Sequence, residues 1–201
     1  MDYLNVPYQI IVVDDGSTDQ TGLVASNHKI LLVKNKRNRG KGYSIRRALR
    51  YAQGDIIVTI DSDGEHQPKE IPSLIEPLYN GADVVAGSRF LGANGNQVTT
   101  KINQIGNFLF NLTIMSITGK YITDSQSGFR AMKRSVIDKL QLQSDGYEIE
   151  TEITIKSLRN GYAFQELPIT VQRRRYNHSK IKLVHDGTKI LKTMVKASIQ
   201  P

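Results

Sequence analysis

The stretch D-I-I-V-T-I-D-S-D-G-E, residues 55–65, contains the pattern from which the fold of this chain is predicted. Its apolar part, residues 56–60, is rich in β-branched side chains, which is typical of a strand buried on both faces, as in a parallel sheet. The strand pattern ends at Asp61 and Asp63, and Gly64 then breaks it. Carboxylates at the carboxyl end of a buried strand lie where open α/β sheets bind ligands.

The spacing of Asp61 and Asp63 predicts a divalent cation site. Two carboxylates so close together repel each other and raise each other's pKa, and a bound cation removes that penalty. Carboxylate oxygens suit Mg²⁺ or Mn²⁺, and Mg²⁺ usually takes one or two carboxylates together with substrate phosphates. A D-x-D pair also occurs by chance or as a helix cap, so a structural role remains the alternative.

Composition narrows the class of protein. The chain has 201 residues and no cysteine, which suits one domain without disulfides or a thiolate metal site. It has no run of about 18 apolar residues, and it does not begin like a signal peptide, so we expect a protein that faces the cytoplasm. The net charge of +8 suits an anionic membrane or a phosphorylated ligand, and no nucleic-acid-binding module is recognisable.

Outside the first stretch, strand and helix patterns alternate at short spacing. Strands are predicted at 9–15, 29–33, 82–86 and 162–172, and helices at about 43–52, 68–79 and 147–160. This alternation predicts βαβ units and a mostly parallel sheet with flanking helices. No internal repeat and no flexible linker appears, so residues 1–201 are predicted to form a single domain.

A basic loop, N-K-R-N-R-G-K-G at residues 35–42, opens the helix predicted from Tyr43. The positive end of that helix and the side chain of Lys41 are positioned to face a diphosphate. A solvated basic turn is an equally good interpretation of the loop.

Two amphipathic helices are predicted in the C-terminal half. The first carries an apolar stripe that we expect to be core: Ile105, Phe108, Leu109, Leu112 and Met115. The second, at about 183–199, has an apolar side and basic residues elsewhere. Its apolar residues are Leu183, Val184, Ile190, Leu191, Met194 and Val195, and its lysines are Lys189, Lys192 and Lys196. Such a helix suits a membrane interface, and packing of its apolar side within the protein is the alternative.

Six motifs follow one another along nearly the whole chain: V-V-D-D-G-S-T-D, N-R-G-K-G, D-S-D-G-E-H-Q-P, G-S-R, D-S-Q-S-G-F-R and R-Y-N-H-S-K. In this order they resemble the inverting family-2 glycosyltransferases of the GT-A fold, and among them the dolichyl-phosphate mannosyltransferase-like branch. The resemblance implies a Rossmann-like α/β fold. It also implies transfer of a hexose from a nucleotide sugar, of the GDP-mannose or UDP-glucose type, to a polyprenyl or dolichyl phosphate.

The resemblance further implies roles for single residues. Val13 and Asp15 are expected at the nucleoside of the donor. Asp61 and Asp63 are expected to hold Mg²⁺ or Mn²⁺ against the diphosphate. Glu65 stands where the family often has Gln, and it is predicted as a further metal ligand.

Phosphate binding and catalysis fall to other positions that match the family. Ser62, Arg89, Arg174 and Lys180 are expected to bind the donor, and the three cations suit the phosphate of either substrate. Asp124 is the candidate catalytic or acceptor-organising carboxylate. Ordinary alternatives exist, because Asp15 also suits a helix cap, Arg89 a surface ion pair and Asp124 a turn.

The chemistry agrees with these residue types. A diphosphate leaving group gains negative charge as the anomeric bond breaks, and a metal with cationic side chains stabilises that charge. A phosphate acceptor is already ionised and needs little help from a base, whereas a saccharide hydroxyl acceptor would need one, with Asp124 the first candidate. An acceptor of that second kind is the alternative function.

One departure from the family concerns the start of the chain. The family begins with an additional strand and helix, and the strand is central in its sheet and contributes donor contacts. Here Met1 lies just before the strand predicted at 9–15, so we expect this first β-α unit to be missing and strand edges to be exposed. A catalytically inactive, basic, membrane-associated fragment is therefore the third interpretation.

Overall fold

The computed structural model describes residues 6–92, 101–172 and 183–199, except for the side chains at 102–103, 183–186 and 198–199. The strands are β1 (Ile11–Asp14), β2 (Leu31–Lys34), β3 (Ile56–Thr59), β4 (Val84–Ser88), β5 (Arg130–Lys133) and β6 (Phe164–Pro168). The α-helices are α1 (Thr21–Ser26), α2 (Lys41–Leu49), α3 (Ile71–Tyr79), α5 (Lys101–Thr118), α6 (Arg134–Ile137), α7 (Ile149–Arg159) and α8 (Leu183–Ile199), and a 3₁₀ turn, η2 (Pro68–Glu70), precedes α3.

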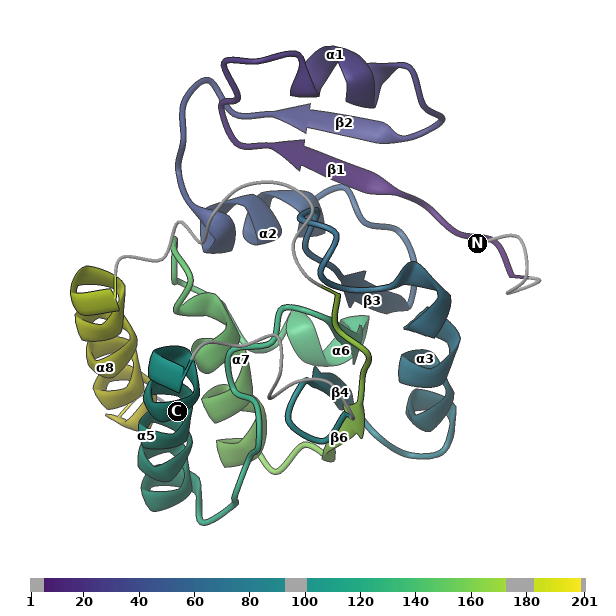
Figure 1. Ribbon diagram of the computed structural model, residues 1–201. Coiled ribbons are helices and arrows are strands. Elements are labelled where there is room, and N and C mark those ends of the chain that lie inside the picture. Colours follow the sequence, from purple (N-terminus) through teal and green to yellow (C-terminus); the bar gives the residue numbers. More distant parts are fainter. Residues whose placement is uncertain (1–5, 93–100, 173–182, 200–201) are drawn as a thin grey trace.

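The strands form two sheets (Figure 1). β1 and β2 pair in parallel, with Val13 opposite Val33. The second sheet has the order β3-β5-β4-β6, in which β4 and β6 pair in parallel and β5 runs antiparallel to both β3 and β4. Strands β3, β4 and β6 thus point the same way, which confirms the predicted mostly parallel α/β architecture.

The position of β3 corrects the prediction that this strand is buried on both faces. β3 is the edge strand of its sheet, and all four of its residues are only half-buried. Its one partner strand, β5, is antiparallel, with Val58 opposite Ala131. In the part of the chain that the structure describes, no strand joins β3 to the β1–β2 sheet, so both sheets have an exposed edge.

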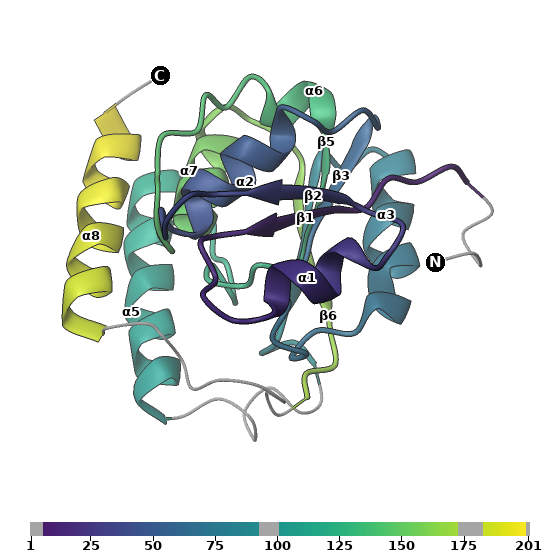
Figure 2. The same cartoon turned by 90° about the horizontal axis from the view of Figure 1, so that it is seen from above.

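Helices cover both faces of the four-stranded sheet. On one face, Ile71, Leu74 and Leu78 of α3 form a buried cluster with β4 and β5. On the other face, residues of α6 and α7, among them Ile137 and Ile153, pack against the same strands. Figures 1 and 2 show α3 on one side of the molecule and α5, α7 and α8 together on the other.

Helix α5 faces the opposite way from the prediction. The five residues expected in the core are 41% to 62% exposed: Ile105, Phe108, Leu109, Leu112 and Met115. The buried side of the helix instead carries Asn107, Asn111 and Ile114. Both asparagines donate to the backbone oxygen of Thr123, at 2.9 and 2.8 Å. The partner of each amide nitrogen offsets part of the cost of its burial, and the larger apolar side chains are left outside.

Helix α8 packs beside α5 and α7 and buries only part of its apolar side. Ile190, Met194 and Ala197 lie in a cluster with residues of α5 and α7. Leu191 and Val195 remain 47% and 59% exposed. The packing alternative is therefore confirmed for part of the apolar side, and the membrane interface stays a prediction. Among the described residues, no helix is both long enough and apolar enough to cross a bilayer.

Candidate active site

Lys41 lies between two carboxylates at the end of β3. Its Nζ is 2.7 Å from Asp61 Oδ1 and 2.7 Å from Glu150 Oε1. Asp61 follows β3 directly after Ile60, Lys41 is the first residue of α2, and Glu150 lies in the first turn of α7. The consecutive elements α2 and β3 thus meet the distant α7 around one ammonium group.

Burial and charge both act on this triad. Burial alone would lower the pKa of Lys41, but the charges of Glu150 and Asp61 outweigh burial and raise it, so the ammonium form is held firmly. Burial raises the pKa of Glu150, and Lys41 acts in the opposite direction. The Lys41 ammonium therefore makes the neighbouring carboxylates of Asp61 and Glu150 compatible. The sequence predicts that a metal does the same for Asp61 and Asp63.

Gly128 allows the Lys41–Asp61 pair to form. A methyl group at this position would overlap Lys41 Nζ and lie 2.7 Å from Asp61 Oδ2. The neighbouring backbone is also tied to β3, since Thr59 Oγ1 donates to the carbonyl of Gly128 at 2.8 Å. The glycine of the D-S-Q-S-G-F-R motif thus brings the loop before β5 against the ends of β3 and α2.

The residues present fit a divalent cation only in part. Asp63 lies in the turn after Asp61, where its Oδ1 accepts from the backbone N–H of Glu65 at 3.0 Å, and Ser62 between the two acids is exposed. Among the described residues, no group of three or more acids or histidines could hold a metal by itself. Two carboxylates that need further oxygens from a substrate diphosphate match the usual Mg²⁺ arrangement.

Arg89 and Asp124 form a second charged pair at the same edge of the sheet. Arg89 Nε and Nη2 donate to the two oxygens of Asp124 at 2.7 and 2.9 Å, and the Arg89 backbone N–H donates to Oδ2 at 3.1 Å. Asp124 is fully buried. Burial alone would lower the pKa of Arg89, but Asp124 outweighs it and raises it. Glu65 faces the same guanidinium, with Oε1 3.7 Å from Nη1, so its part as a metal ligand stays a prediction.

The backbone around Asp124 is held from three sides. Glu166 in β6 accepts from the N–H groups of Thr123 and Asp124, at 2.7 and 2.8 Å. The asparagines on the inner side of α5 bind the Thr123 carbonyl. Arg130 is buried and donates to the carbonyls of Ser125 and Ser127, at 2.9 and 2.8 Å. The predicted turn is therefore a fixed platform for Asp124.

Asp15 organises the basic loop. Its oxygens accept from the backbone N–H groups of Arg39 and Gly40, at 2.9 and 2.8 Å, and from Asn35 Nδ2 at 2.6 Å. The helix-cap alternative is therefore wrong, because Asp15 holds the loop before α2 and makes no side-chain cap of α1 or α2. Val13, in β1, is half-buried. A contact of either residue with a nucleoside stays a prediction.

The start of α2 corrects the prediction that this helix end faces a diphosphate. The N–H groups of Gly42 and Tyr43 donate to the carbonyls of Gly146 and Asp145, at 3.1 and 3.0 Å. The side chain of Lys41, the first residue of α2, contacts the Asp61 carboxylate instead.

His66 lies beside the acids, where its ring stacks on Phe129 with the centroids 5.3 Å apart. Burial lowers the pKa of His66 and so favours the neutral ring. Arg174 and Lys180, the other predicted phosphate-binding residues, lie outside the described residues.

Residues 4–141 match Glycosyl transferase family 2. The chain belongs to this family. Two curated relatives are similar over most of it. One is the dolichol-phosphate mannosyltransferase of Pyrococcus furiosus, 30% identical, where the match covers 87% of this chain and 51% of the relative. The other is the UDP-N-acetylglucosamine–dolichyl-phosphate N-acetylglucosaminyltransferase of Methanococcus voltae, 31% identical over 90% of this chain and 81% of the relative.

A solved glycosyltransferase structure shares the fold. It is the glucosyl-3-phosphoglycerate synthase of Mycobacterium tuberculosis bound to phosphoglyceric acid, with a TM-score of 0.73 and 25% identity over 96% of this chain and 70% of that one. The same enzyme has been solved with Mn²⁺ and UDP. The predicted family, the α/β GT-A fold and the transferase class are therefore confirmed.

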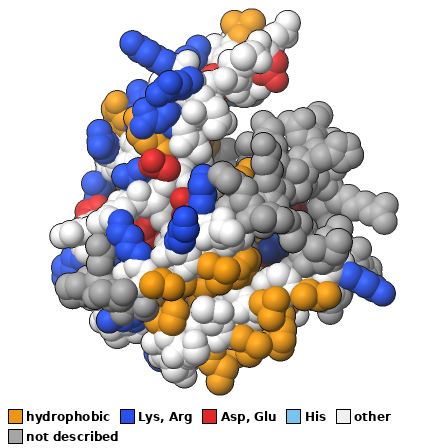
Figure 3. Space-filling model, turned by 90° about the vertical axis from the view of Figure 1, so that its left-hand side faces the viewer, with side chains coloured by type: hydrophobic (Ala, Val, Ile, Leu, Met, Phe, Trp, Pro, Cys, Tyr) orange, Lys and Arg blue, Asp and Glu red, His pale blue; other side chains and the backbone are white. Residues whose placement is uncertain are grey.

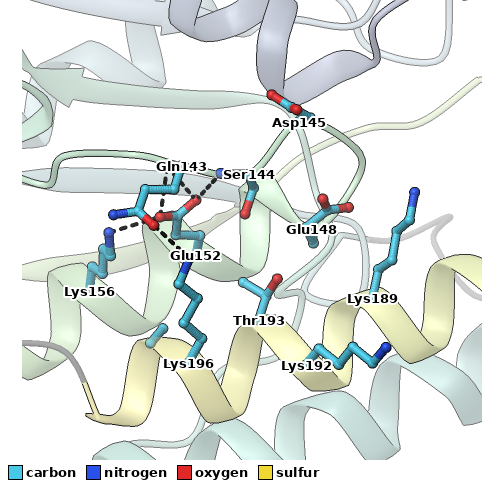
Figure 4. Close-up of a pocket in the computed structure, with 11 residues that line it drawn as sticks. Gln143, Ser144, Asp145, Glu148, Glu152, Lys156, Lys189, Lys192, Thr193 and Lys196 are labelled. Atoms are coloured by element: carbon cyan, nitrogen blue, oxygen red, sulfur yellow. Dashed lines mark hydrogen bonds and ion pairs between the residues drawn. The ribbon is translucent and has the colours of Figure 1, made fainter.

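A groove, shown in Figure 4, lies between α8 and the start of α7, apart from the acids of the candidate active site. It has a volume of about 370 Å³ and shares no lining residue with the Lys41 triad or the Arg89–Asp124 pair. In it, Glu152 pairs with Lys156 at 2.8 Å and accepts from the N–H groups of Gln143 and Ser144. Glu152 thus forms a structural ion pair with Lys156 and holds the backbone of the loop at residues 143–144.

Sequence reasoning missed Glu150 and Glu166. Glu148, Glu150 and Glu152 alternate at the start of α7, and at 100° per residue three such acids cannot share one face. Glu150 therefore lies on another side of the helix from the other two, and all three are buried. Only the packing of α2 on α7 places Glu150 beside Lys41.

Proposed function

We propose that this protein transfers a hexose from a nucleotide sugar to a polyprenyl or dolichyl phosphate, with Mg²⁺ or Mn²⁺ at Asp61 and Asp63. The observation that carries the proposal is the meeting of this acid pair, Lys41 and the buried Arg89–Asp124 pair at one sheet edge, in a chain of glycosyl transferase family 2. A donor of the GDP-mannose or UDP-glucose type is part of the same proposal. The dolichyl-phosphate names of two relatives support the acceptor class.

The residues divide the work by charge. When bound, the cation supplies positive charge to the diphosphate that leaves the sugar. Asp61 and Asp63 would hold it, and Lys41 then shares Asp61 with the cation while keeping its contact with Glu150. An ammonium fixed beside a diphosphate stabilises the charge that develops on the leaving oxygen without transferring a proton.

The environment of Asp124 favours a phosphate acceptor over a saccharide hydroxyl. Both oxygens of this buried carboxylate accept from Arg89. A proton taken from a hydroxyl would neutralise Asp124 and leave the largely buried guanidinium of Arg89 without its counter-charge, which is costly. A phosphate oxygen is already ionised and requires no such step.

A lipid-linked acceptor also suits a protein that binds a membrane surface. We propose a peripheral location at the cytoplasmic face of a membrane. The net charge of +8 supports this, because the cytoplasmic leaflet carries anionic lipids.

The test is transfer of labelled sugar by the purified protein. With Mn²⁺, labelled GDP-mannose or UDP-glucose and a short-chain polyprenyl phosphate that dissolves in water, label should pass into an organic extract, and chelation of the metal should stop transfer. Absence of transfer from every nucleotide sugar, together with absence of GDP and UDP binding in calorimetry, would favour the inactive fragment.

Asp124→Asn separates the two acceptor classes. With a phosphate acceptor we expect kcat to fall by less than about tenfold, whereas loss of a general base usually costs about 10²- to 10⁴-fold. Asp138→Asn, which changes an exposed acid paired with Arg134, is the matched control. A loss in the larger range, or transfer only to saccharides, would reject the phosphate acceptor.

A further inference from the structure

An apolar surface covers the outside of two neighbouring helices. We define the outer face as Ile105, Phe108, Leu109, Leu112 and Met115 of α5 together with Leu191 and Val195 of α8. Every one of these side chains is at least 41% exposed. In Figure 3, hydrophobic side chains gather in two ridges on this side of the molecule. Contiguous exposed apolar side chains of this kind mark interaction sites more often than ordinary surface.

The charge around the outer face is positive. Lys101 and Lys120 are exposed at the two ends of α5, and Lys189, Lys192 and Lys196 are exposed along α8 on the side that lines the groove in Figure 4. Helix α5 itself contains no acidic residue between Lys101 and Thr118. Lys and Arg side chains line one margin of the ridges in Figure 3. A second copy of this chain would bring like charges together, whereas an anionic lipid surface complements them.

The same helix connects the outer face to the candidate active site. Asn107 and Asn111 on the buried side of α5 hold the carbonyl of Thr123, the residue before Asp124. A helix with its side chains is about 10 Å across. A surface in contact with the outer face of α5 is therefore separated from the Asp124 platform by the thickness of one helix.

We infer that the outer face docks this protein on an anionic lipid bilayer. The apolar side chains of α5 and α8 enter the boundary between headgroups and acyl chains, and the lysines of α8 meet the headgroups. The inference deepens the proposed function, since a polyprenyl phosphate keeps its tail in the bilayer while its phosphate must reach the site. In this arrangement the main contact with the bilayer is made by the apolar side of α5 and not by the lysines of α8.

Flotation with vesicles tests the inference. We expect the protein to bind phosphatidylcholine vesicles that contain phosphatidylglycerol, and to bind less as salt rises. The variant Phe108→Gln with Leu109→Gln should bind about tenfold less tightly, because two apolar side chains no longer enter the bilayer. The matched control is Leu23→Gln with Val24→Gln on α1, where the side chains are 63% and 55% exposed but lie outside the outer face. This control should bind as the parent does.

Three results would overturn the inference. They are absence of parent binding to these vesicles, equal binding by the α5 variant, and a dimer of the parent that the α5 variant abolishes without any change in vesicle binding. Since the substituted side chains point outward, urea unfolding of the variant should match the parent and exclude a folding defect.

Transfer assays distinguish failure here from failure of the proposed function. With the water-soluble short-chain acceptor, the α5 variant should keep the parent rate. With a long-chain acceptor in vesicles it should be about tenfold slower. If neither protein transfers sugar but the vesicle results hold, only the proposed function fails. If both transfer sugar at equal rates in vesicles, only the docking inference fails.

Discussion

At the scale of residues, Asp61 and Asp124 are useful because of what surrounds them. Asp61 and Glu150, which lie 89 residues apart in the sequence, both contact the ammonium group of Lys41. Asp124 is held by a two-point contact with Arg89, which restricts its rotation as well as its charge. Each carboxylate thus has a cationic partner in place before any substrate arrives.

Replacing both Asp61 and Asp63 with Asn tests the metal site. The amides keep the size of the side chains but lose the charge that attracts a cation, so the Mn²⁺-dependent part of GDP or UDP affinity should fall by about tenfold or more. Titration calorimetry with and without Mn²⁺ measures it, and Asp138→Asn should behave as the parent does. Unchanged metal dependence in the double variant would mean that the two acids are structural.

At the scale of elements, α2 is positioned by direct contact between backbones. Gly42 lies so close to the loop before α7 that a Cβ would overlap the carbonyl oxygen of Ser144. This approach lets the N–H groups at the start of α2 bond to that loop, and it brings Lys41 within reach of Glu150.

Gly42→Ala should therefore destabilise the protein by about 1–3 kcal/mol, the usual cost of forcing extra atoms into a packed contact. Gly106→Ala is the matched control, because Gly106 lies inside α5 with no atom within 4 Å of the added methyl. Alanine there should be neutral or stabilising by up to about 1 kcal/mol. Urea unfolding compares the two, and equal stability of both variants would show that the α2 contact yields without cost.

At the scale of the whole molecule, buried charge makes stability depend on pH. Burial alone would raise the pKa of Glu152, but hydrogen bonds from Lys156, Ser144 and Gln143 outweigh it and hold the pKa below its usual range. A carboxyl with a lowered pKa contributes stability above its unfolded pKa, and that contribution is lost as the pH falls through the folded value. Glu150 has a raised pKa and so acts with the opposite sign.

Glu152→Gln should accordingly cost about 3 kcal/mol near pH 7, because it leaves the buried Lys156 ammonium without its ion pair. The difference from the parent should shrink as the pH falls below about 4.3, the ordinary pKa of a glutamate. Urea unfolding of both proteins across the acid range measures this. If the difference in unfolding free energy between the two proteins stays constant with pH, Glu152 stabilises the protein through its shape and not through its charge.

The amino-acid sequence alone determined the α/β class, the approximate positions of most strands and helices, the family, and the acids that follow β3. These features are local, since β-branched runs, glycines and short motifs carry them. The tertiary structure decided which side of α5 is buried, because apolar residues occur on both sides and the backbone of Thr123 and Ser125 gives Asn107 and Asn111 partners inside. It also decided that β3 is an edge strand and that Lys41 joins Asp61 to Glu150. Such contacts join residues whose separation along the chain does not predict their distance in space.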